Sequence, residues 1–256
     1  MRKKNALVLA LIMLGGLSAS HIPASAQTPP SAKEIAAYTG LHAAAHRGDA
    51  RRIIRLLAGG ANANAVDGNG RTPLHVAAFA GKHAAMRALA KGGSNPRALD
   101  KQLYDTVTIA AVADDLRTMQ VALEIGGSPR EITSIYGGTA LIAAAHLGHY
   151  LIIDQLIRAG APRDHVNNLG WTALLEAVIL GDGGQRHTIS VEMLVATGAR
   201  HDLADKDGVT PLEHARRRGY TTMVNILEAM ANSAPHTGKL EPRIKRFKLP
   251  DPAPAN

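Results

Sequence analysis

A regular spacing of 33 to 38 residues runs through the middle of this 256-residue chain. Three columns of residues share that period and stay in register with one another. They are Thr72, Thr106, Thr139, Thr172 and Thr210; Gly60, Gly93, Gly127, Gly160 and Gly198; and Gly48, Gly81, Gly148, Gly181 and Gly219. A period of this length predicts an array of small supersecondary units that bury their apolar faces against each other.

Each unit carries the local signals of two short helices. In the second unit Thr72 is suited to cap the first helix, and Pro73 suits the first helical position. Gly81 and Gly93 are suited to end the two helices, because glycine readily adopts the left-handed conformation. Residues 67–70, Asp-Gly-Asn-Gly, predict a tight hairpin-like turn between units. Only 3% of residues are aromatic, and the small apolar side chains let neighbouring helices approach closely.

These marks resemble the ankyrin repeat. Residues 71–78 read Arg-Thr-Pro-Leu-His-Val-Ala-Ala, residues 207–212 read Asp-Gly-Val-Thr-Pro-Leu, and residues 41–44 read Leu-His-Ala-Ala. The stretches 136–139 and 167–184 are similar to a subfamily of bacterial exported (periplasmic) ankyrin-repeat proteins. The resemblance implies an all-α fold, an ankyrin-repeat solenoid of about six helix-turn-helix units joined by hairpin-like turns. It also implies that His42 and His75 hold adjacent turns together.

The expected organisation has four parts. Residues 1–26 are a cleaved signal peptide, residues 27–35 a linker that starts the N-terminal cap, residues 36–230 the repeat domain, and residues 231–256 a flexible, basic, Pro-rich tail. The six units are expected near residues 36–66, 67–99, 100–133, 134–166, 167–204 and 205–230. Ser31 with Glu34 fits a capping box, which predicts a helix from about Ala32 over the first edge of the stack.

The first 26 residues have the three regions of a signal peptide. A basic segment at residues 2–4 precedes an apolar run at residues 6–17, and Ala-Ser-Ala at residues 24–26 fits a cleavage site. The apolar run is short for a membrane-spanning helix, which needs about 20 residues, and an uncleaved anchor is the alternative. We therefore expect a periplasmic or secreted protein, soluble after cleavage between Ala26 and Gln27. The absence of cysteine suits an oxidising compartment.

Two units depart from the common pattern. In the third, residues 106–109 read Thr-Val-Thr-Ile in place of Thr-Pro-Leu-His, and Asp115 stands where the other units have glycine. We expect this repeat to be the least stable. In the fifth, five extra residues fall between the two helices, at residues 181–187, which predicts a protruding loop. The insertion is either a tolerated surface feature, because loops accept length changes, or a docking loop or small site.

The formal charge of +8 comes mostly from the two ends of the chain. Residues 1–26 and residues 239–256 contribute +3 each, whereas residues 27–238 hold 21 basic and 19 acidic groups. The body of the protein is therefore nearly neutral, which removes the main support for a nucleic-acid partner. The basic tail is suited to contact an anionic surface or an acidic partner.

The resemblance implies that partners meet the inner-helix face and the turn tips. The outward positions of each inner helix fall one, four and five residues after the histidine of the Thr-Pro-Leu-His pattern, which is His75 in the second unit. The side chains at these positions are apolar in the central units and basic in the terminal units. An exposed apolar strip is typical of partner contact; the alternative is that these side chains pack between neighbouring helices. The candidate partner-binding residues are Phe79, Tyr136, His146, Leu147, Trp171, Glu176, Ile179, Leu180, Arg217 and Arg218.

Three of these candidates allow more than one interpretation. Tyr136 and Trp171 are turn-tip aromatics of the kind that dominates interfaces, or each ring covers an adjacent turn. Glu176 is expected either to accept a hydrogen bond from a partner or to bond the backbone of the neighbouring turn.

No motif in the sequence predicts catalysis or a cofactor. His42 and His46 have helical spacing but no third ligand nearby, so no metal site is expected. We expect a non-enzymatic scaffold or adaptor, monomeric, that binds an unidentified envelope protein and meets a membrane only through its signal peptide. The alternatives are a metal- or cofactor-linked stress-defence protein or hydrolase with a site near Glu176 and Asp182, and a secreted effector that binds host proteins.

Overall fold

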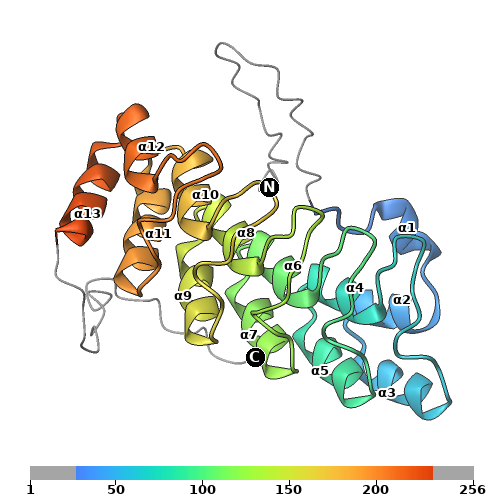
Figure 1. Ribbon diagram of the computed structural model, residues 1–256. Helices are drawn as coiled ribbons and strands as arrows, with labels where there is room; N and C mark the ends of the chain where they lie inside the picture. Colours follow the sequence, from blue (N-terminus) through green and yellow to red (C-terminus); the bar gives the residue numbers. More distant parts are fainter. Residues whose placement is uncertain (1–26, 233–256) are drawn as a thin grey trace, which may run out of the picture.

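The computed structural model describes residues 27–232, so the expected signal peptide and most of the expected tail lie outside the described residues. Within residues 27–232 the regular structure is helical, apart from one isolated bridge between Thr133 and Gly138. The predicted all-α solenoid is confirmed (Figure 1). No helix in the described part is both long enough and apolar enough to cross a membrane.

One short helix, α1 (Ala32–Ala37), is followed by six helix pairs in the described residues. The inner helices are α2 (Gly40–Arg47), α4 (Pro73–Phe79), α6 (Thr106–Val112), α8 (Ala140–His146), α10 (Ala173–Ile179) and α12 (Pro211–Arg217). The outer helices are α3 (Ala50–Ala58), α5 (His83–Lys91), α7 (Leu116–Glu124), α9 (Tyr150–Arg158), α11 (Gln185–Ala196) and α13 (Thr221–Ala231). Inner helices pack on inner helices and outer on outer, which makes a two-layer stack (Figure 1).

The helix ends follow the local signals of the sequence. The Thr72 hydroxyl accepts the N–H of His75 at the start of α4, and Pro73 occupies the first turn. Gly81 and Gly93 follow α4 and α5 with φ of 62° and 89°, in the left-handed region that glycine tolerates. The capping box of Ser31 is also present and starts α1 at Ala32. These predictions are confirmed because each depends only on residues within one helical turn.

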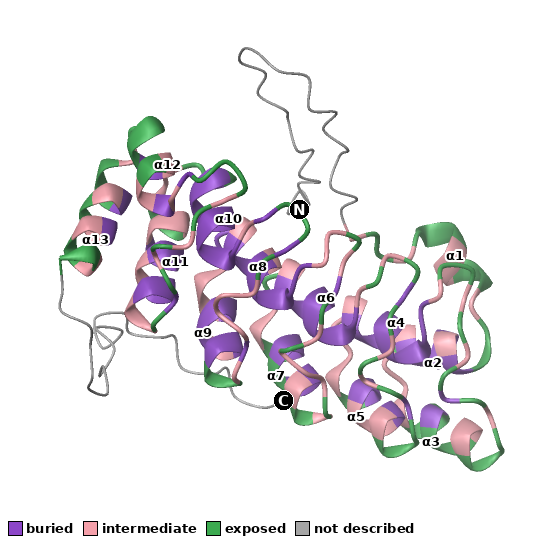
Figure 2. Ribbon diagram, in the orientation of Figure 1, coloured by how far each residue is buried: buried purple, intermediate pink, exposed green. Residues whose placement is uncertain are grey.

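One continuous apolar core runs between the two rows of helices, from Leu41 in α2 to Leu227 in α13. Figure 2 shows the inner row buried along most of its length. One column of the inner helices is completely buried alanine: Ala44, Ala77, Ala110, Ala144, Ala177 and Ala215. Because these side chains are so small, consecutive inner helices can pack closely. The core is shared between repeats, so each repeat depends on its neighbours for stability.

The turns between repeats are held by one recurring side chain. Asp67, Asp100, Asn167 and Asp205 occupy the same position of their turns. In each, a side-chain oxygen accepts the backbone N–H groups two and four residues later. This arrangement satisfies the donors inside the turn and fixes its shape.

The histidines of the Thr-Pro-Leu-His position join one repeat to the next. Nε2 of His42 lies 2.9 Å from the carbonyl oxygen of Arg71, and Nε2 of His75 lies 3.0 Å from that of Tyr104. Both carbonyls belong to the following turn. The implied role of the two rings, holding adjacent turns together, is therefore confirmed.

The third repeat has a register one residue away from the predicted one. Asp105, and not Thr106, is the N-cap of α6. Asp114, and not Asp115, occupies the left-handed position that Gly81 has in the second repeat, with a φ of 53°. An Asp and a Thr stand side by side here and both are good cap residues, so the local pattern alone does not distinguish them.

The extra residue of this part of the chain lies in the turn before α8. The N–H of Thr133 donates to the carbonyl of Gly138, a span of five residues, whereas the corresponding bond spans four residues in the other turns. The left-handed glycine after α7 is accordingly Gly126 and not Gly127. The outward positions of the third repeat thus become Ile109, Val112 and Ala113 in place of Ala110, Ala113 and Asp114.

The insertion at residues 181–187 does not form the protruding loop that we expected. Its second half is the first turn of α11, which has 12 residues where α9 has 9. Nε2 of His187 lies 3.0 Å from the carbonyl oxygen of His146, and the Arg186 guanidinium donates to the carbonyl of Gly148 at 3.2 Å. The added residues therefore lengthen a helix and bind back onto the previous repeat.

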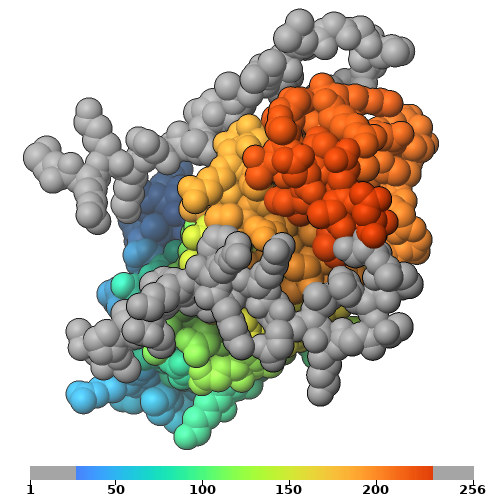
Figure 3. Space-filling view, turned by 90° about the vertical axis from the view of Figure 1, so that its left-hand side faces the viewer, coloured from blue at the N-terminus to red at the C-terminus, as the bar shows by residue number. Residues whose placement is uncertain are grey.

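The last repeat ends the stack with a polar outer surface. Figure 3 shows the molecule from this end, which α12 and α13 form. The exposed residues of α13 include Thr221, Thr222 and Asn225. A polar face suits a terminal repeat, because no further helix pair of the described chain covers it.

Candidate protein-binding surface

The outward face of the inner helices is only partly accessible. The positions one residue after the His position pack inside, as Ala43, Val76 and Glu176 do. Accessible residues lie at the C-caps of five inner helices, which we call the C-cap row: Ala80, Ala113, Leu147, Leu180 and Arg218. The candidate surface is therefore narrower than the sequence indicated.

Leu147 and Leu180 are the large apolar members of the C-cap row. Leu180 is 43% exposed and Leu147 is half-buried. Their helices, α8 and α10, pack directly against each other. Ile179 is only 9% exposed, and Phe79 is half-buried against the core, so both serve mainly to pack the stack. Of the four apolar groove candidates, the two leucines are thus the ones a partner can reach.

Glu176 is bonded within the stack. It is 4% exposed, and its carboxylate accepts the side-chain amide N–H of Asn167 at 2.9 Å. Its other oxygen lies 3.2 Å from Nδ1 of His146. The hydrogen bond of Glu176 goes to the Asn167 side chain and not to the backbone of the neighbouring turn, which was one of the two alternatives. Glu176 thereby braces the turn that begins at Asn167, and a bond to a partner stays a prediction.

Arg217 and Arg218 form the basic end of the inner-helix face, and one of them has a contact within the protein. Arg218 lies over the Tyr220 ring, with 5.9 Å between its guanidinium carbon and the ring centroid. Arg217 is exposed, one residue before this cation–π pair. Both guanidiniums remain at the surface, where they can meet acidic or polar groups.

The two candidate aromatics, Tyr136 and Trp171, are half-buried in their turns. The Tyr136 carbonyl accepts the N–H of Asn168 at 2.8 Å, which ties its turn to the next. The accessible apolar side chains at these tips are Ile135 and Leu169, which are 53% and 41% exposed. The aromatics therefore support the tips, and the neighbouring aliphatic residues present the surface.

Aliphatic residues of the turns form a surface that the sequence reasoning missed. Ile135 and Leu169 lie at the same turn position, two residues after the turn begins. A further column, one residue before each turn, is exposed by 43 to 62%: Val66, Leu99, Ile132 and Val166. Their spacing of 33, 33 and 34 residues was visible in the sequence. The spacing does not by itself predict exposure, because the neighbouring repeat decides whether a side chain before a turn is covered.

The residues named for an alternative catalytic or metal site already have protein partners. Asp182 accepts from His187, with 2.9 Å between Oδ1 and Nδ1. A backbone N–H of Gly184, and then His187, hold the pKa of the Asp182 carboxyl below its ordinary value. Within residues 27–232, no group of three or more His, Asp or Glu side chains is placed to hold a metal ion.

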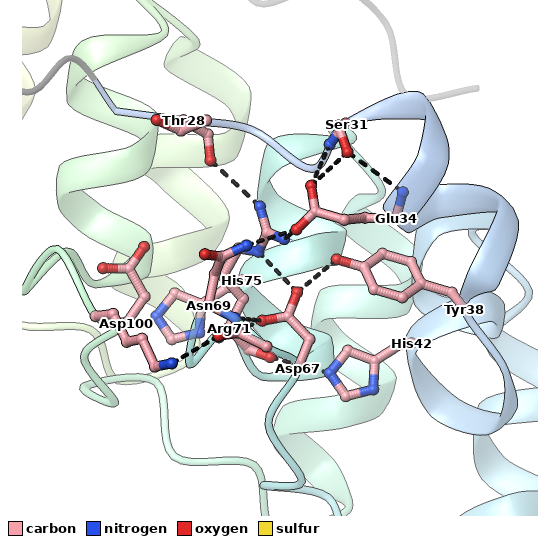
Figure 4. A network of polar contacts seen from close by, with 12 residues as sticks. Thr28, Ser31, Glu34, Tyr38, His42, Asp67, Asn69, Arg71, His75 and Asp100 are labelled. Atoms are coloured by element: carbon pink, nitrogen blue, oxygen red, sulfur yellow. Dashed lines mark hydrogen bonds and ion pairs between the residues drawn. The ribbon is translucent and has the colours of Figure 1, made fainter.

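A buried polar network lies at the N-terminal end of the stack (Figure 4). Arg71 is 1% exposed and donates to Glu34, to Asp67 at 2.8 Å and to the carbonyl of Thr28 at 3.4 Å. The Tyr38 hydroxyl donates to the same Asp67 at 2.6 Å. Bonds from Ser31, followed by the Arg71 guanidinium, lower the pKa of Glu34 to about 2. Each of these polar groups is bonded to another group of the network. The network therefore fastens α1 to the stack and is not a ligand site.

The fold and surface together define a class of protein. It is a solenoid of short helix pairs with a continuous alanine-rich core, regular hairpin turns and accessible apolar side chains on the inner-helix C-caps and the turns. Such stacks present an extended surface for other macromolecules rather than an enclosed pocket.

Comparison with known proteins identifies the family. The profile described as "Ankyrin repeats (3 copies)" matches residues 7–100 and 41–123, and that described as "Ankyrin repeat" matches residues 136–168. An ankyrin repeat domain from Acinetobacter baumannii AYE has a TM-score of 0.70 and 40% identity, over 75% of this chain and 97% of that one. The ankyrin repeat protein EF0377 has a TM-score of 0.68 and 28% identity, over 75% and 98%. This chain belongs to the ankyrin-repeat family.

Two further likenesses are more limited. The ankyrin repeat domain of human ASB11 has a TM-score of 0.62 at 23% identity, over 78% of this chain and 86% of that one, and shows the fold alone. The Escherichia coli K12 ankyrin repeat protein YahD is 42% identical over 52 residues, which are 20% of this chain. The match spans about a quarter, 26%, of that relative. Ankyrin repeats generally serve as protein–protein interaction modules, and this chain has their fold.

Proposed function

We propose that this protein is an exported ankyrin-repeat scaffold or adaptor that binds another protein of the cell envelope. The observation that carries the proposal is the pair of accessible leucines, Leu147 and Leu180, at the C-caps of two adjacent inner helices. Burial of such side chains by a partner is favourable, at about 25 cal/mol for each Å² of apolar surface. A monomeric stack leaves them in water.

The turn tips extend this surface toward the neighbouring repeats. Ile135 and Leu169 are exposed on consecutive turns, and Tyr136 and Trp171 stiffen the same turns from within. A rigid support lowers the ordering cost of binding. We propose that a partner lies along α8 and α10 and reaches these tips, with Arg217 and Arg218 at the edge of the contact.

Export is proposed from the leader sequence. The basic segment, the apolar run at residues 6–17 and the Ala-Ser-Ala at residues 24–26 support cleavage before Gln27 and a periplasmic or secreted destination. The test is the N-terminal sequence of the protein recovered from the producing cell. A mature chain that begins at Gln27 supports export, and one that retains residues 1–26 contradicts it.

The binding surface is tested by capture from a detergent-solubilised envelope extract. The bait is the full mature chain, compared with a Leu147→Asp, Leu180→Asp variant. A matched control is Gln120→Asp, because Gln120 is exposed on the outer helix α7, away from the C-cap row. We expect a specific partner to be retained by the native chain and by the control and lost from the double variant.

Two results would contradict the proposed surface. One is an unchanged set of captured proteins with the double variant, which would remove the C-cap row from the interface. The other is equal loss with the Gln120→Asp control, which would show that capture does not depend on this face. Circular dichroism of all three proteins establishes that each variant keeps the helical content of the native chain.

A further inference from the structure

The nearly neutral body of the protein conceals a strong separation of charge along the stack. Residues 27–99 hold 10 Lys and Arg against 3 Asp and Glu, a net charge of +7. Residues 100–232 hold 11 Lys and Arg against 16 Asp and Glu, a net charge of −5. The first two repeats are therefore basic and the remainder is acidic. A molecule with this distribution has a preferred orientation near any charged surface.

The basic charge gathers on the outer side of the first repeat. We define the α3 patch as Arg51, Arg52, Ile54 and Arg55 of α3, all of which are exposed. None of its three arginines forms an ion pair with another described residue. The one carboxylate nearby in sequence, that of Asp49, accepts the backbone N–H of Arg52 at 2.9 Å and serves as the helix cap.

Two other outer helices, α5 and α9, differ from α3 in this respect. On α5, Arg87 is paired with Glu124 of the next repeat, at 2.7 Å. On α9, Arg158 is paired with Asp154, at 2.9 Å. On α7, Arg117 has no ion pair and donates to Gln120 at 3.4 Å. What distinguishes α3 is that it carries three exposed arginines without an ion pair.

Ile54 stands in the middle of this charge. It is 58% exposed, whereas Ile53 beside it is completely buried in the core. Helix α3 lies at one end of the stack, with α2 and α5 as its packing neighbours (Figure 1). An exposed isoleucine among exposed arginines on an end helix has the form of an interfacial anchor, in which cations meet lipid headgroups and the apolar side chain enters the boundary below them.

We propose that the α3 patch docks on an anionic lipid surface. The arginines supply the electrostatic attraction, and Ile54 supplies a short-range apolar contact that a duplex nucleic acid does not offer on its phosphate backbone. The acidic repeats, with their net charge of −5, are repelled by the same surface, so the stack stands end-on. Leu147 and Leu180 of the C-cap row lie three and four repeats further along the stack, so they stay open to a protein partner.

The test is co-sedimentation of the full mature chain with lipid vesicles. One set is phosphatidylcholine alone, and the other contains phosphatidylcholine and phosphatidylglycerol at 7:3. The patch variant is Arg51→Glu, Arg55→Glu. Its control is Arg117→Glu, Arg130→Glu, which changes the net charge equally at two exposed arginines of the acidic repeats. An Ile54→Asn variant examines the apolar contact separately.

We expect the native chain to prefer the anionic vesicles and to lose this preference as salt is raised. With about 1 kcal/mol for each basic residue near the surface, the patch variant should bind at least about tenfold more weakly. The control should bind within about threefold of the native chain, because its altered charges lie away from the surface. Ile54→Asn should weaken binding about fivefold, as partial burial of one large aliphatic side chain implies.

Three results would overturn the proposal. The first is no preference of the native chain for anionic vesicles. The second is equal weakening by the patch variant and its charge-matched control, which would assign the attraction to net charge or to another segment. The third is a patch variant that loses binding to a duplex DNA probe but keeps vesicle binding. If the Glu variant fails to fold, Arg51→Gln, Arg55→Gln is measured in its place against Arg117→Gln, Arg130→Gln.

Discussion

Arg71, in the second repeat, forms an ion pair with Glu34 of the capping helix α1. The arginine is completely enclosed, and it holds Asp67 of its own turn and the carbonyl of Thr28 at the same time (Figure 4). A single side chain thus joins the N-terminal segment, the cap and the turn between the first two repeats. The cap is fastened to the stack by charge and hydrogen bonds as well as by apolar contact.

Replacement of Arg71 by methionine should lower the free energy of unfolding by about 2–3 kcal/mol, because two carboxylates lose their buried partner. Glu34 is partly exposed, and water compensates some of the loss. Urea unfolding followed by circular dichroism measures the change. Arg97→Met is the control: Arg97 is exposed and lies 3.6 Å from Glu131, so we expect less than about 0.5 kcal/mol. Equal effects of the two variants would show that the enclosure of Arg71 does not matter.

The same ion pair predicts acid sensitivity. In the folded protein, hydrogen bonds from Ser31 and the charge of Arg71 lower the pKa of Glu34 from 4.5 to about 2. A carboxyl with a lowered pKa stabilises the fold above its unfolded pKa and loses that contribution as the pH falls toward its folded pKa. Unfolding free energies should therefore decline between pH 4.5 and pH 2. The Glu34→Gln variant should show a shallower decline, and parallel curves for the two proteins would refute this assignment.

His75 predicts a second pH dependence near neutrality. Burial lowers the pKa of this imidazole below its ordinary value of 6.5, so the folded protein holds it neutral. Its contribution is complete above pH 6.5 and is lost as the pH falls toward the folded pKa, with a slope of up to about 1.4 kcal/mol per pH unit. Denaturant unfolding from pH 7.5 to pH 5 should show this slope. A His75→Gln variant should be less stable at pH 7.5 and should vary less with pH.

Two glycines of one turn should respond differently to substitution. Gly70 has a φ of 75°, and a Cβ there would lie 3.0 Å from the backbone nitrogen of Lys101. Gly70→Ala should therefore lower the free energy of unfolding by about 1–2 kcal/mol. Gly68 has open space around it and an ordinary φ, so Gly68→Ala should stay within about 0.5 kcal/mol of the native chain. Thermal unfolding of both variants and of the native chain measures this difference in stability.

Replacement of Glu176 should lower the stability of the fold, because its side chain is buried within the stack. Glu176→Ala removes the acceptor of the Asn167 amide and the neighbour of His146, and leaves a buried space. We expect a loss of about 2–3 kcal/mol in urea unfolding. Glu228→Ala, which removes a surface ion pair with Arg216, should cost less than about 1 kcal/mol. A native-like stability of Glu176→Ala would return Glu176 to the list of partner contacts.

Much of the fold could be predicted because its signals are local and repeated. A threonine before a proline, a glycine nine residues later and an Asp-Gly turn each act within a few residues. The third repeat shows where this reasoning ends. Asp105 and Thr106 are equally suited to cap α6 on local grounds, and the buried Thr106 hydroxyl donates to the carbonyl of Pro96 instead. Packing between repeats therefore determines that Asp105 is the N-cap of α6.

The candidate surface was predicted less well, because accessibility depends on neighbours that are distant in sequence. Ile179 and Leu180 look alike in the pattern, but one is 9% and the other 43% exposed. Glu176 stands at an outward position of an inner helix, yet its carboxylate has partners on the adjacent helix and turn. Pairing of this kind requires three-dimensional proximity that no spacing within a single repeat reveals.

The sequence by itself determined the repeat, its caps and its turns, because one period written several times specifies one unit and the way it stacks. Only the tertiary structure decided which side chains the stack leaves open. It placed the insertion at residues 181–187 against the previous repeat, and it enclosed Arg71 beneath the capping helix. It also left the arginines of α3 without carboxylate partners at the end of the stack. The physical reason is that burial and ion pairing arise between repeats, whereas helix and turn signals arise within them.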